Sequence, residues 1–164
     1  MKDIKYLIVH HTERNNDFPA FINFRHKFLR GWDKIGYHYL IGNRRPFTKD
    51  GFLYAGRKEN ETGAHAFGFN EISLGICLIG NLDKSNPTLK QLQTLVTLLK
   101  SKMKQYGIPA ENVLGHRELS GVVKTCPGKN LDMEILRQII TGKVEFQALV
   151  SGEYQKERVT CNAL

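Results

Sequence analysis

The stretch Ile4-Lys5-Tyr6-Leu7-Ile8-Val9-His10-His11 decides the fold of this chain. It is rich in β-prone residues and is apolar on both faces from Tyr6 to Val9, which is the pattern of a central strand covered on both sides. The strand ends in two histidines, and a side chain at the end of a buried strand reaches a cleft more easily than one in mid-strand. Taken alone, however, His10 and His11 are more simply interpreted as polar residues at a strand end.

The next element along the chain is a predicted helix over residues 17–30. Asp17 is its candidate N-cap, and Pro19 stands in the first turn, where a proline is tolerated. A connector over residues 31–36 follows it. The apolar residues of this predicted helix are Phe21, Phe24, Phe28 and Leu29.

The rest of the chain alternates strands, helices and one long loop. A hairpin is predicted from the turn signal Asp50-Gly51, and the clearest helix covers residues 88–106, with Thr88 as its N-cap. Residues 55–71 form a loop, and a long loop in a compact domain is more often functional than accidental. The predicted strands are 37–41, 52–54, 72–79 and 112–114, and the last predicted helix is 132–140.

The length of 164 residues and the hydrophobic fraction of 41% favour a single soluble globular domain with one core. We place this domain at residues 1–142 and interpret residues 143–164 as an appended tail, because they are mixed in charge and weakly periodic. No stretch approaches the roughly 18 apolar residues of a transmembrane helix, and the first residues lack the features of a signal peptide. We therefore expect a protein that is cytoplasmic on synthesis and does not insert into a membrane. We also expect a monomer.

The net charge of +8 favours an anionic partner, which is a nucleic acid, a membrane surface or an acidic polymer such as bacterial cell wall. No nucleic-acid partner is expected, because the basic residues are dispersed and are not interleaved with aromatic residues. The three cysteines, Cys77, Cys126 and Cys161, are an odd and scattered set that indicates a reducing compartment rather than a disulfide framework.

The segment 115–128 carries a histidine, His116, ten positions before a cysteine, Cys126. Imidazole and thiolate are ligands that Zn²⁺ readily accepts. Together with one of the strand-end histidines they make three ligands from separate segments. Structural zinc sites are usually closed by four ligands in close pairs, so this pattern indicates a site with an open position and favours metal-assisted hydrolysis.

Spacing alone leaves two further roles open for Cys126. In the first, Cys126 is a free thiol and His116 is an ordinary loop histidine. In the second, Cys126 is the nucleophile of a cysteine enzyme. The Cys-Pro-Gly turn argues against a nucleophile, because a reactive thiolate is more usually set at a helix N-terminus.

Seven short motifs are spread over residues 4–140. They are Ile8-Val9-His10-His11-Thr12, Ile35-Gly36-Tyr37-His38-Tyr39, Ala55-Gly56-Arg57, Gly63-Ala64-His65, Ser73-Leu74-Gly75-Ile76, Gly115-His116-Arg117-Glu118 and Lys124-Thr125-Cys126-Pro127-Gly128. In this order they are found in zinc-dependent N-acetylmuramoyl-L-alanine amidases. The chain resembles the branch of that family that contains phage lysozyme-type amidases and peptidoglycan recognition proteins.

The resemblance implies an α/β fold in a single domain, with a mixed central β-sheet of about five strands flanked by helices. It also implies Zn²⁺ as cofactor, held by His10, His116 and Cys126, and so favours His10 over His11 as the first ligand. In another amidase branch a glutamate acts as base at the position that Cys77 occupies here, which argues against that mechanism for this chain.

Further residues receive roles from the resemblance. Tyr37 and Lys124 match the tyrosine and the lysine that assist catalysis in this branch, where each can stabilise the charge that develops on the carbonyl oxygen. Arg57 and His65 lie in the predicted loop 55–71 and are expected to bind the substrate, as is Asn70.

The activity implied is hydrolysis of the amide bond between N-acetylmuramic acid and L-alanine in peptidoglycan. The resemblance suggests a lytic enzyme of a phage or prophage that acts on the cell wall after release. The alternative is a peptidoglycan-binding module of the same fold that does not cut. Such a module typically lacks the cysteine ligand or the tyrosine, and both are present in this chain.

Overall fold

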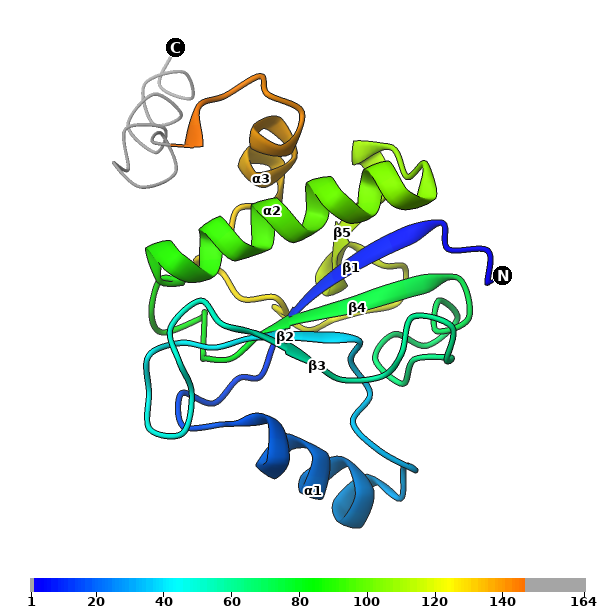
Figure 1. Cartoon of the computed structure of the whole chain (residues 1–164), viewed down its shortest axis with the longest axis vertical. Helices are drawn as coiled ribbons and strands as arrows, with labels where there is room; N and C mark the ends of the chain where they lie inside the picture. The colour runs from blue at the N-terminus through cyan, green and yellow to red at the C-terminus, as the bar shows by residue number, and fades with distance from the viewer. Residues whose placement is uncertain (1, 147–164) are drawn as a thin grey trace.

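The computed structural model describes residues 2–146, which form a mixed α/β fold around one five-stranded sheet (Figure 1). The strand order is β3-β2-β4-β1-β5, with β3 antiparallel to β2 and all other neighbours parallel. The fold class expected from the resemblance is therefore confirmed. The strands are β1 (Tyr6–His11), β2 (Tyr39–Ile41), β3 (Leu53–Ala55), β4 (Ser73–Leu78) and β5 (Val113–Gly115).

Strand β1 lies at the centre of the sheet, between β4 and β5, and every residue from Leu7 to His11 is buried. Successive side chains of a strand point to opposite faces of the sheet. Leu7 and Val9 pack into the largest apolar cluster, whereas Ile8 packs on the other face with Leu119. The doubly covered central strand predicted from the sequence is thus present.

Two helices cover one face of the sheet (Figure 1). Helix α2 (Leu89–Tyr106) begins with a capping box between Thr88 and Gln91, as its N-cap prediction requires. Helix α3 (Met133–Ile140) begins at Asp132, whose carboxylate accepts hydrogen bonds from two backbone N–H groups of the first turn. The large apolar cluster lies between these helices and the sheet.

Helix α1 (Pro19–Arg30) is the one described helix on the opposite face in Figure 1. The prediction of Asp17 as its N-cap is wrong, because Phe18 holds that position without a side-chain cap. Asp17 is instead buried, and its two carboxylate oxygens accept hydrogen bonds of 2.7 and 3.0 Å from Arg25. The buried side chains of α1 are Ile22 and His26, so the phenylalanines that predicted the helix do not form its buried face.

Element bounds differ from the predicted ones by one or two residues, most clearly in β2, which begins at Tyr39 rather than at residue 37. Two short 3-10 helices, η1 (Ala110–Asn112) and η2 (His116–Glu118), flank β5. None of the helices in the described part of the chain is long and apolar enough to cross a membrane. Residues 147–164, which make up most of the predicted tail and include Cys161, lie outside the described residues.

Candidate metal centre

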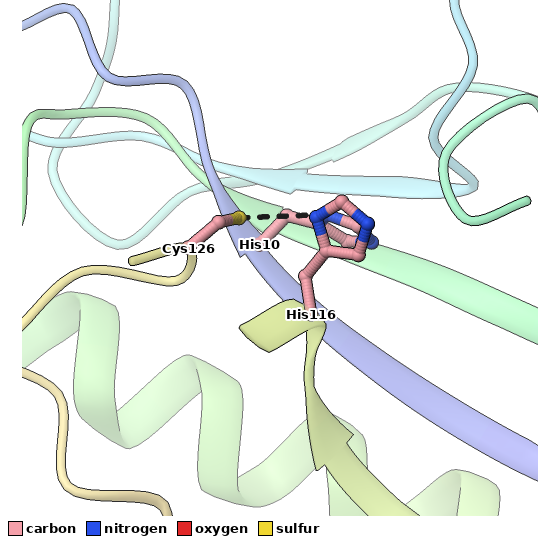
Figure 2. A group of neighbouring side chains, drawn as sticks. All are labelled: His10, His116 and Cys126. Carbon is pink, nitrogen blue, oxygen red and sulfur yellow. Dashed lines mark hydrogen bonds between the residues drawn. The ribbon is translucent and has the colours of Figure 1, made fainter. Parts of the chain in front are cut away.

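Three donor side chains converge at the carboxyl end of β1 (Figure 2). His10 lies in β1, His116 begins η2 directly after β5, and Cys126 lies in the loop that leads to α3. Their ligand atoms all lie within 4.8 Å of one another. The Nδ1 atom of His10 is 3.6 Å from the Sγ atom of Cys126, and the ring centroids of His10 and His116 are 4.6 Å apart.

This donor set fits Zn²⁺. Tetrahedral coordination with bonds of about 2.1 Å to nitrogen and 2.3 Å to sulfur places the two donor atoms about 3.6 Å apart. The distance between His10 Nδ1 and Cys126 Sγ is 3.6 Å. A group of two imidazoles and one thiolate also leaves a fourth tetrahedral position for water or substrate, which is the arrangement of a catalytic rather than a structural zinc site.

The geometry of β1 explains why His10 rather than His11 belongs to the group. His10 pairs in register with Cys77 of β4 and shares its face of the sheet with Ile8. His11 points to the other face, where its Nδ1 atom accepts a hydrogen bond of 3.0 Å from the backbone N–H of Leu82. Because successive side chains of a strand point to opposite faces, His10 belongs to the group of possible metal ligands, whereas the adjacent His11 accepts a hydrogen bond from a loop.

Arg117 fixes His116 and Cys126 relative to each other. Its backbone N–H donates to the carbonyl of Cys126 at 2.6 Å. Its guanidinium donates to the carbonyl oxygens of Thr125, Gly128 and Leu131 at 3.1, 2.6 and 2.7 Å. One arginine thus ties the turn that carries the histidine to the loop that carries the cysteine.

The loop around Cys126 packs closely on its surroundings. The peptide bond between Cys126 and Pro127 is cis, and Gly128 has a φ of 104°. A Cβ atom on Gly128 would lie 2.5 Å from the Cβ atom of Leu82, so only glycine fits this position without a shift. Cys126 itself is 4% exposed.

Electrostatics favour a metal ligand over a free nucleophile at Cys126. Burial raises the pKa of the Cys126 thiol to about 12, although the backbone N–H of His11 and the Lys124 ammonium act in the opposite direction. A thiol with such a pKa is a poor nucleophile near neutral pH, whereas a coordinating thiol is deprotonated by its metal. Burial, followed by the neighbouring His65 and His116, also holds the pKa of His10 well below its ordinary value, which keeps the ring in the neutral form that binds metals.

His65, which is predicted to bind substrate, contacts His10, one of the three donors of the metal group. Its Nδ1 atom lies 3.1 Å from the Nε2 atom of His10, on the side of the His10 ring that faces away from Cys126. Gly63 and Gly75 line the space that its ring fills, because a Cβ atom on either would lie 2.5 Å from a ring carbon of His65. The structure therefore places His65 where it orients His10, and its substrate contact stays a prediction.

Tyr37 lies beside the metal group on the segment that leads into β2. Its ring centroid is 5.2 Å from that of His10 and 5.6 Å from that of His26 in α1. Burial, followed by the neighbouring Cys77 and Cys126, raises the pKa of Tyr37 well above its ordinary value, so its hydroxyl stays protonated. A hydrogen bond between this hydroxyl and the Cys77 side chain contributes to the shift. The structure brings Tyr37 to the site, and its catalytic role stays a prediction.

Lys124 is exposed, and its charge acts on two of the three donor residues. Its positive charge lowers the pKa of both His116 and Cys126. Burial has the larger effect on each: it lowers the pKa of His116 and raises the pKa of Cys126. A cation near such a group of donors is suited to bind an oxygen that becomes negative during a reaction.

The other two predicted substrate residues are engaged within the chain. The Arg57 side chain is 9% exposed and donates to Asp33 and to the carbonyl oxygens of Ile35 and Thr62. The side-chain oxygen of Asn70 accepts hydrogen bonds of 2.8 and 2.9 Å from the backbone N–H groups of His65 and Ala66. Both residues organise the loop that carries His65, and direct contact with a substrate stays a prediction for each.

Sequence reasoning gave no role to Arg117, Gly63 or Gly75, although the structure makes all three important for the position of the donors. The available signal was their place inside the motifs that carry the resemblance. A single arginine or glycine shows no spacing pattern of its own, because what it contacts depends on how the chain folds around it.

The chain is similar to known proteins over most of its described length. The family model of N-acetylmuramoyl-L-alanine amidase matches residues 1–129. The solved structure of the amidase LysC from Clostridium intestinale has a TM-score of 0.76 and 33% sequence identity, and the match covers 85% of this chain and 86% of that chain. Peptidoglycan-recognition protein LB of Drosophila melanogaster is 39% identical over 111 residues, and the endolysin of Escherichia phage T7 is 35% identical over 107 residues.

Several of these relatives are longer than the match. The match covers 67% of this chain and 44% of the Drosophila protein, and 62% of this chain and 64% of the phage endolysin. It covers 65% of this chain but only 19% of a mouse N-acetylmuramoyl-L-alanine amidase, which is 37% identical over 108 residues. The residues that the family model matches include His10, His116 and Cys126. This chain belongs to the N-acetylmuramoyl-L-alanine amidase family.

Proposed function

We propose that this chain is a zinc-dependent hydrolase of peptidoglycan that cuts the amide bond between N-acetylmuramic acid and L-alanine. The observation that carries this proposal is the convergence of His10, His116 and Cys126 within 4.8 Å, with Tyr37 and Lys124 beside them. Family membership supports the bond that is cut, and the similarity to a phage endolysin supports a lytic role.

The donor set is suited to hold Zn²⁺, which when bound supplies Lewis acidity for the attack of water on an amide carbonyl. The neutral His10 and His116 rings and the Cys126 thiolate provide the ligands. Arg117 holds two of these ligands in register through its contacts with the Cys126 loop. This preorganisation matters because a ligand that must be reoriented on binding reduces metal affinity.

Lys124 and Tyr37 provide charge stabilisation in this mechanism. Negative charge develops on the carbonyl oxygen as the amide is attacked, and a cation and a hydroxyl donor near that oxygen stabilise the transition state more than the substrate. Of the two residues Lys124 is the exposed one, so it meets the substrate first. Tyr37 keeps its proton because its pKa is raised, and it therefore donates to the oxygen rather than repelling it.

A peptidoglycan-binding module without activity is the second candidate, because peptidoglycan-recognition proteins are among the relatives. The complete set of three donors favours the enzyme, since a module that only binds has no use for an open metal position. Both candidates share peptidoglycan as the partner, so binding alone does not separate them.

The deciding experiment incubates the purified chain with isolated peptidoglycan and analyses the products by mass spectrometry. An amidase releases intact stem peptides with a free L-alanine amino group and leaves the glycan strands uncut. Activity should be lost with a chelator and restored by zinc. Binding to peptidoglycan with no released peptide, in a protein that contains zinc, would instead establish the binding module.

A further inference from the structure

Five phenylalanine rings form a continuous row along α1 and the neighbouring loop of residues 42–52. Centroids of successive rings in this row lie 4.7 to 6.5 Å apart. Leu29, at the end of the helix, is 73% exposed as well. We call the row the phenylalanine stripe, and its members in spatial order are Phe47, Phe18, Phe21, Phe24 and Phe28.

The stripe is exposed to an unusual degree. Phe24, Phe28 and Phe47 are 51%, 69% and 80% exposed. The fold does not use these rings, because α1 packs on the rest of the molecule through Ile22 and His26 on its other side. Within the described residues, α1 lies alone on its face of the sheet (Figure 1). A contiguous apolar surface of this kind marks an interaction site.

A basic residue borders the stripe along α1. The helix contains no acidic residue, and its exposed Lys27 lies one helical turn from Phe24. Of the other two cations, Arg25 is paired with the buried Asp17, and Arg30 stacks on the Trp32 ring, which packs on His26. The surface of α1 is therefore apolar in the centre and positive at the edge.

The other end of the stripe has the same character. Three and two positions before Phe47, the exposed Arg44 and Arg45 line a recess of about 350 Å³. The partner that fits this face offers apolar groups and negative charge together.

The chemistry of the stripe selects among such partners. Its members carry no hydroxyl, amide or indole N–H, whereas a sugar is recognised by aromatic rings together with polar groups that bind its hydroxyls. A second copy of the chain would bring the same cations face to face in a symmetric dimer. A surface that combines exposed Phe rings with bordering Lys and Arg side chains is suited to the interface of an anionic bilayer.

We propose that the phenylalanine stripe and its bordering cations form a peripheral docking face for an anionic lipid bilayer. The rings enter the boundary between headgroups and acyl chains, and the cations contact lipid phosphates. This proposal is independent of the amidase activity. The stripe lies on the side of α1 away from His26, which contacts Tyr37 of the metal centre, so docking leaves that centre open to substrate.

The test is co-sedimentation of the full chain with lipid vesicles. Vesicles containing phosphatidylglycerol are compared with vesicles of phosphatidylcholine alone. We expect binding to the anionic vesicles that weakens as salt is added, because salt screens the contribution of the cations.

Variants of the stripe identify the face. Phe24→Gln with Phe28→Gln should weaken vesicle binding by about tenfold or more, because two rings no longer enter the apolar layer. Phe67→Gln is the matched control, since Phe67 is 99% exposed but lies outside the stripe. Thermal unfolding and zinc content should be the same in all three proteins.

A second pair of variants separates charge from apolar contact. Lys27→Gln with Arg45→Gln should weaken binding to anionic vesicles by about 30-fold, because each of these two cations contributes about fivefold near an anionic surface. Lys100→Gln with Lys104→Gln changes the net charge equally on the exposed side of α2 and should have little effect.

Three results would overturn the proposal. The first is a chain that does not bind anionic vesicles. The second is an equal loss of binding in the stripe variant and in the Phe67→Gln control. The third is a concentration-dependent dimer in light scattering that the stripe variant abolishes, which would assign the face to a second copy of the chain.

Discussion

The Nε2 atom of His10 lies 3.1 Å from the Nδ1 atom of His65. The other ring nitrogen of His10 faces Cys126, so a metal bound there requires the proton of His10 to be on Nε2. That proton points at the Nδ1 atom of His65. The contact therefore selects the metal-binding tautomer of His10 and holds the plane of its ring.

Substitution His65→Ala should weaken zinc affinity by about 10–100-fold, which is the usual effect of removing the partner of a ligating histidine. His65→Asn should retain most of the affinity, because its side-chain oxygen offers an acceptor near the position of Nδ1. Competition between the protein and a chromophoric chelator measures both affinities. Equal affinities in wild type and His65→Ala would show that the contact does not orient the ligand.

Substitution Cys126→Ser should remove most of the zinc from the purified protein, because a hydroxyl is a far poorer zinc ligand than a thiolate. Elemental analysis measures the metal content. The matched control is Cys77→Ser, a second buried cysteine whose side chain is outside the metal group. Full zinc occupancy in Cys126→Ser would rule out this residue as a ligand.

Substitutions Lys124→Ala and Tyr37→Phe should each lower kcat on peptidoglycan by about 10²–10³ while zinc content and fold are retained, because we propose that both residues act on the carbonyl oxygen. KM should change much less, since the charge they stabilise exists only near the transition state. Lys129→Ala, which removes an exposed lysine from the same loop, is the control for net charge. Wild-type turnover by Lys124→Ala would exclude the lysine from the mechanism.

His26 should make the fold sensitive to acid. Its Nδ1 atom accepts a hydrogen bond of 3.0 Å from the backbone N–H of Gly36, and burial, followed by Arg30 and Arg25, lowers its pKa to about 4. In the unfolded chain the His26 imidazole has a pKa of about 6.5, so it takes up a proton at a higher pH than in the folded protein. The contribution of His26 to stability is therefore complete above about pH 6.5 and is lost as the pH falls towards 4.

This loss should amount to about 2–3 kcal/mol of unfolding free energy for His26. Urea unfolding at several pH values, with a chelator present throughout so that metal release does not contribute, measures it. His26→Asn keeps an acceptor for Gly36 but does not titrate, so its stability should depend less on pH over this range. An identical pH dependence in both proteins would contradict the prediction.

Much of the fold could be predicted because its signals are local. The apolar run of β1 and the Thr88 cap of α2 depend on residues a few positions apart, and the structure contains both elements as expected. The residue types of the metal group could also be named in advance. The N-cap of α1 could not be predicted correctly, because Asp17 forms an ion pair with Arg25 instead of capping the helix.

The sequence by itself determined the elements of this protein and the chemistry that it carries. Periodicity establishes that Phe21, Phe24 and Phe28 share one side of a helix, and composition establishes that histidine and cysteine are available as ligands. These properties are local because they depend on backbone geometry and on the side chain itself.

Only the tertiary structure decided how these pieces are used. It joined His10 to Cys126 across 116 positions and turned His11 to the opposite face of the sheet. It also placed the phenylalanine stripe on the exposed side of α1, although such a row normally marks a buried face. The physical reason is that the direction of a side chain follows from its own backbone, whereas its surroundings depend on segments that are distant in the sequence.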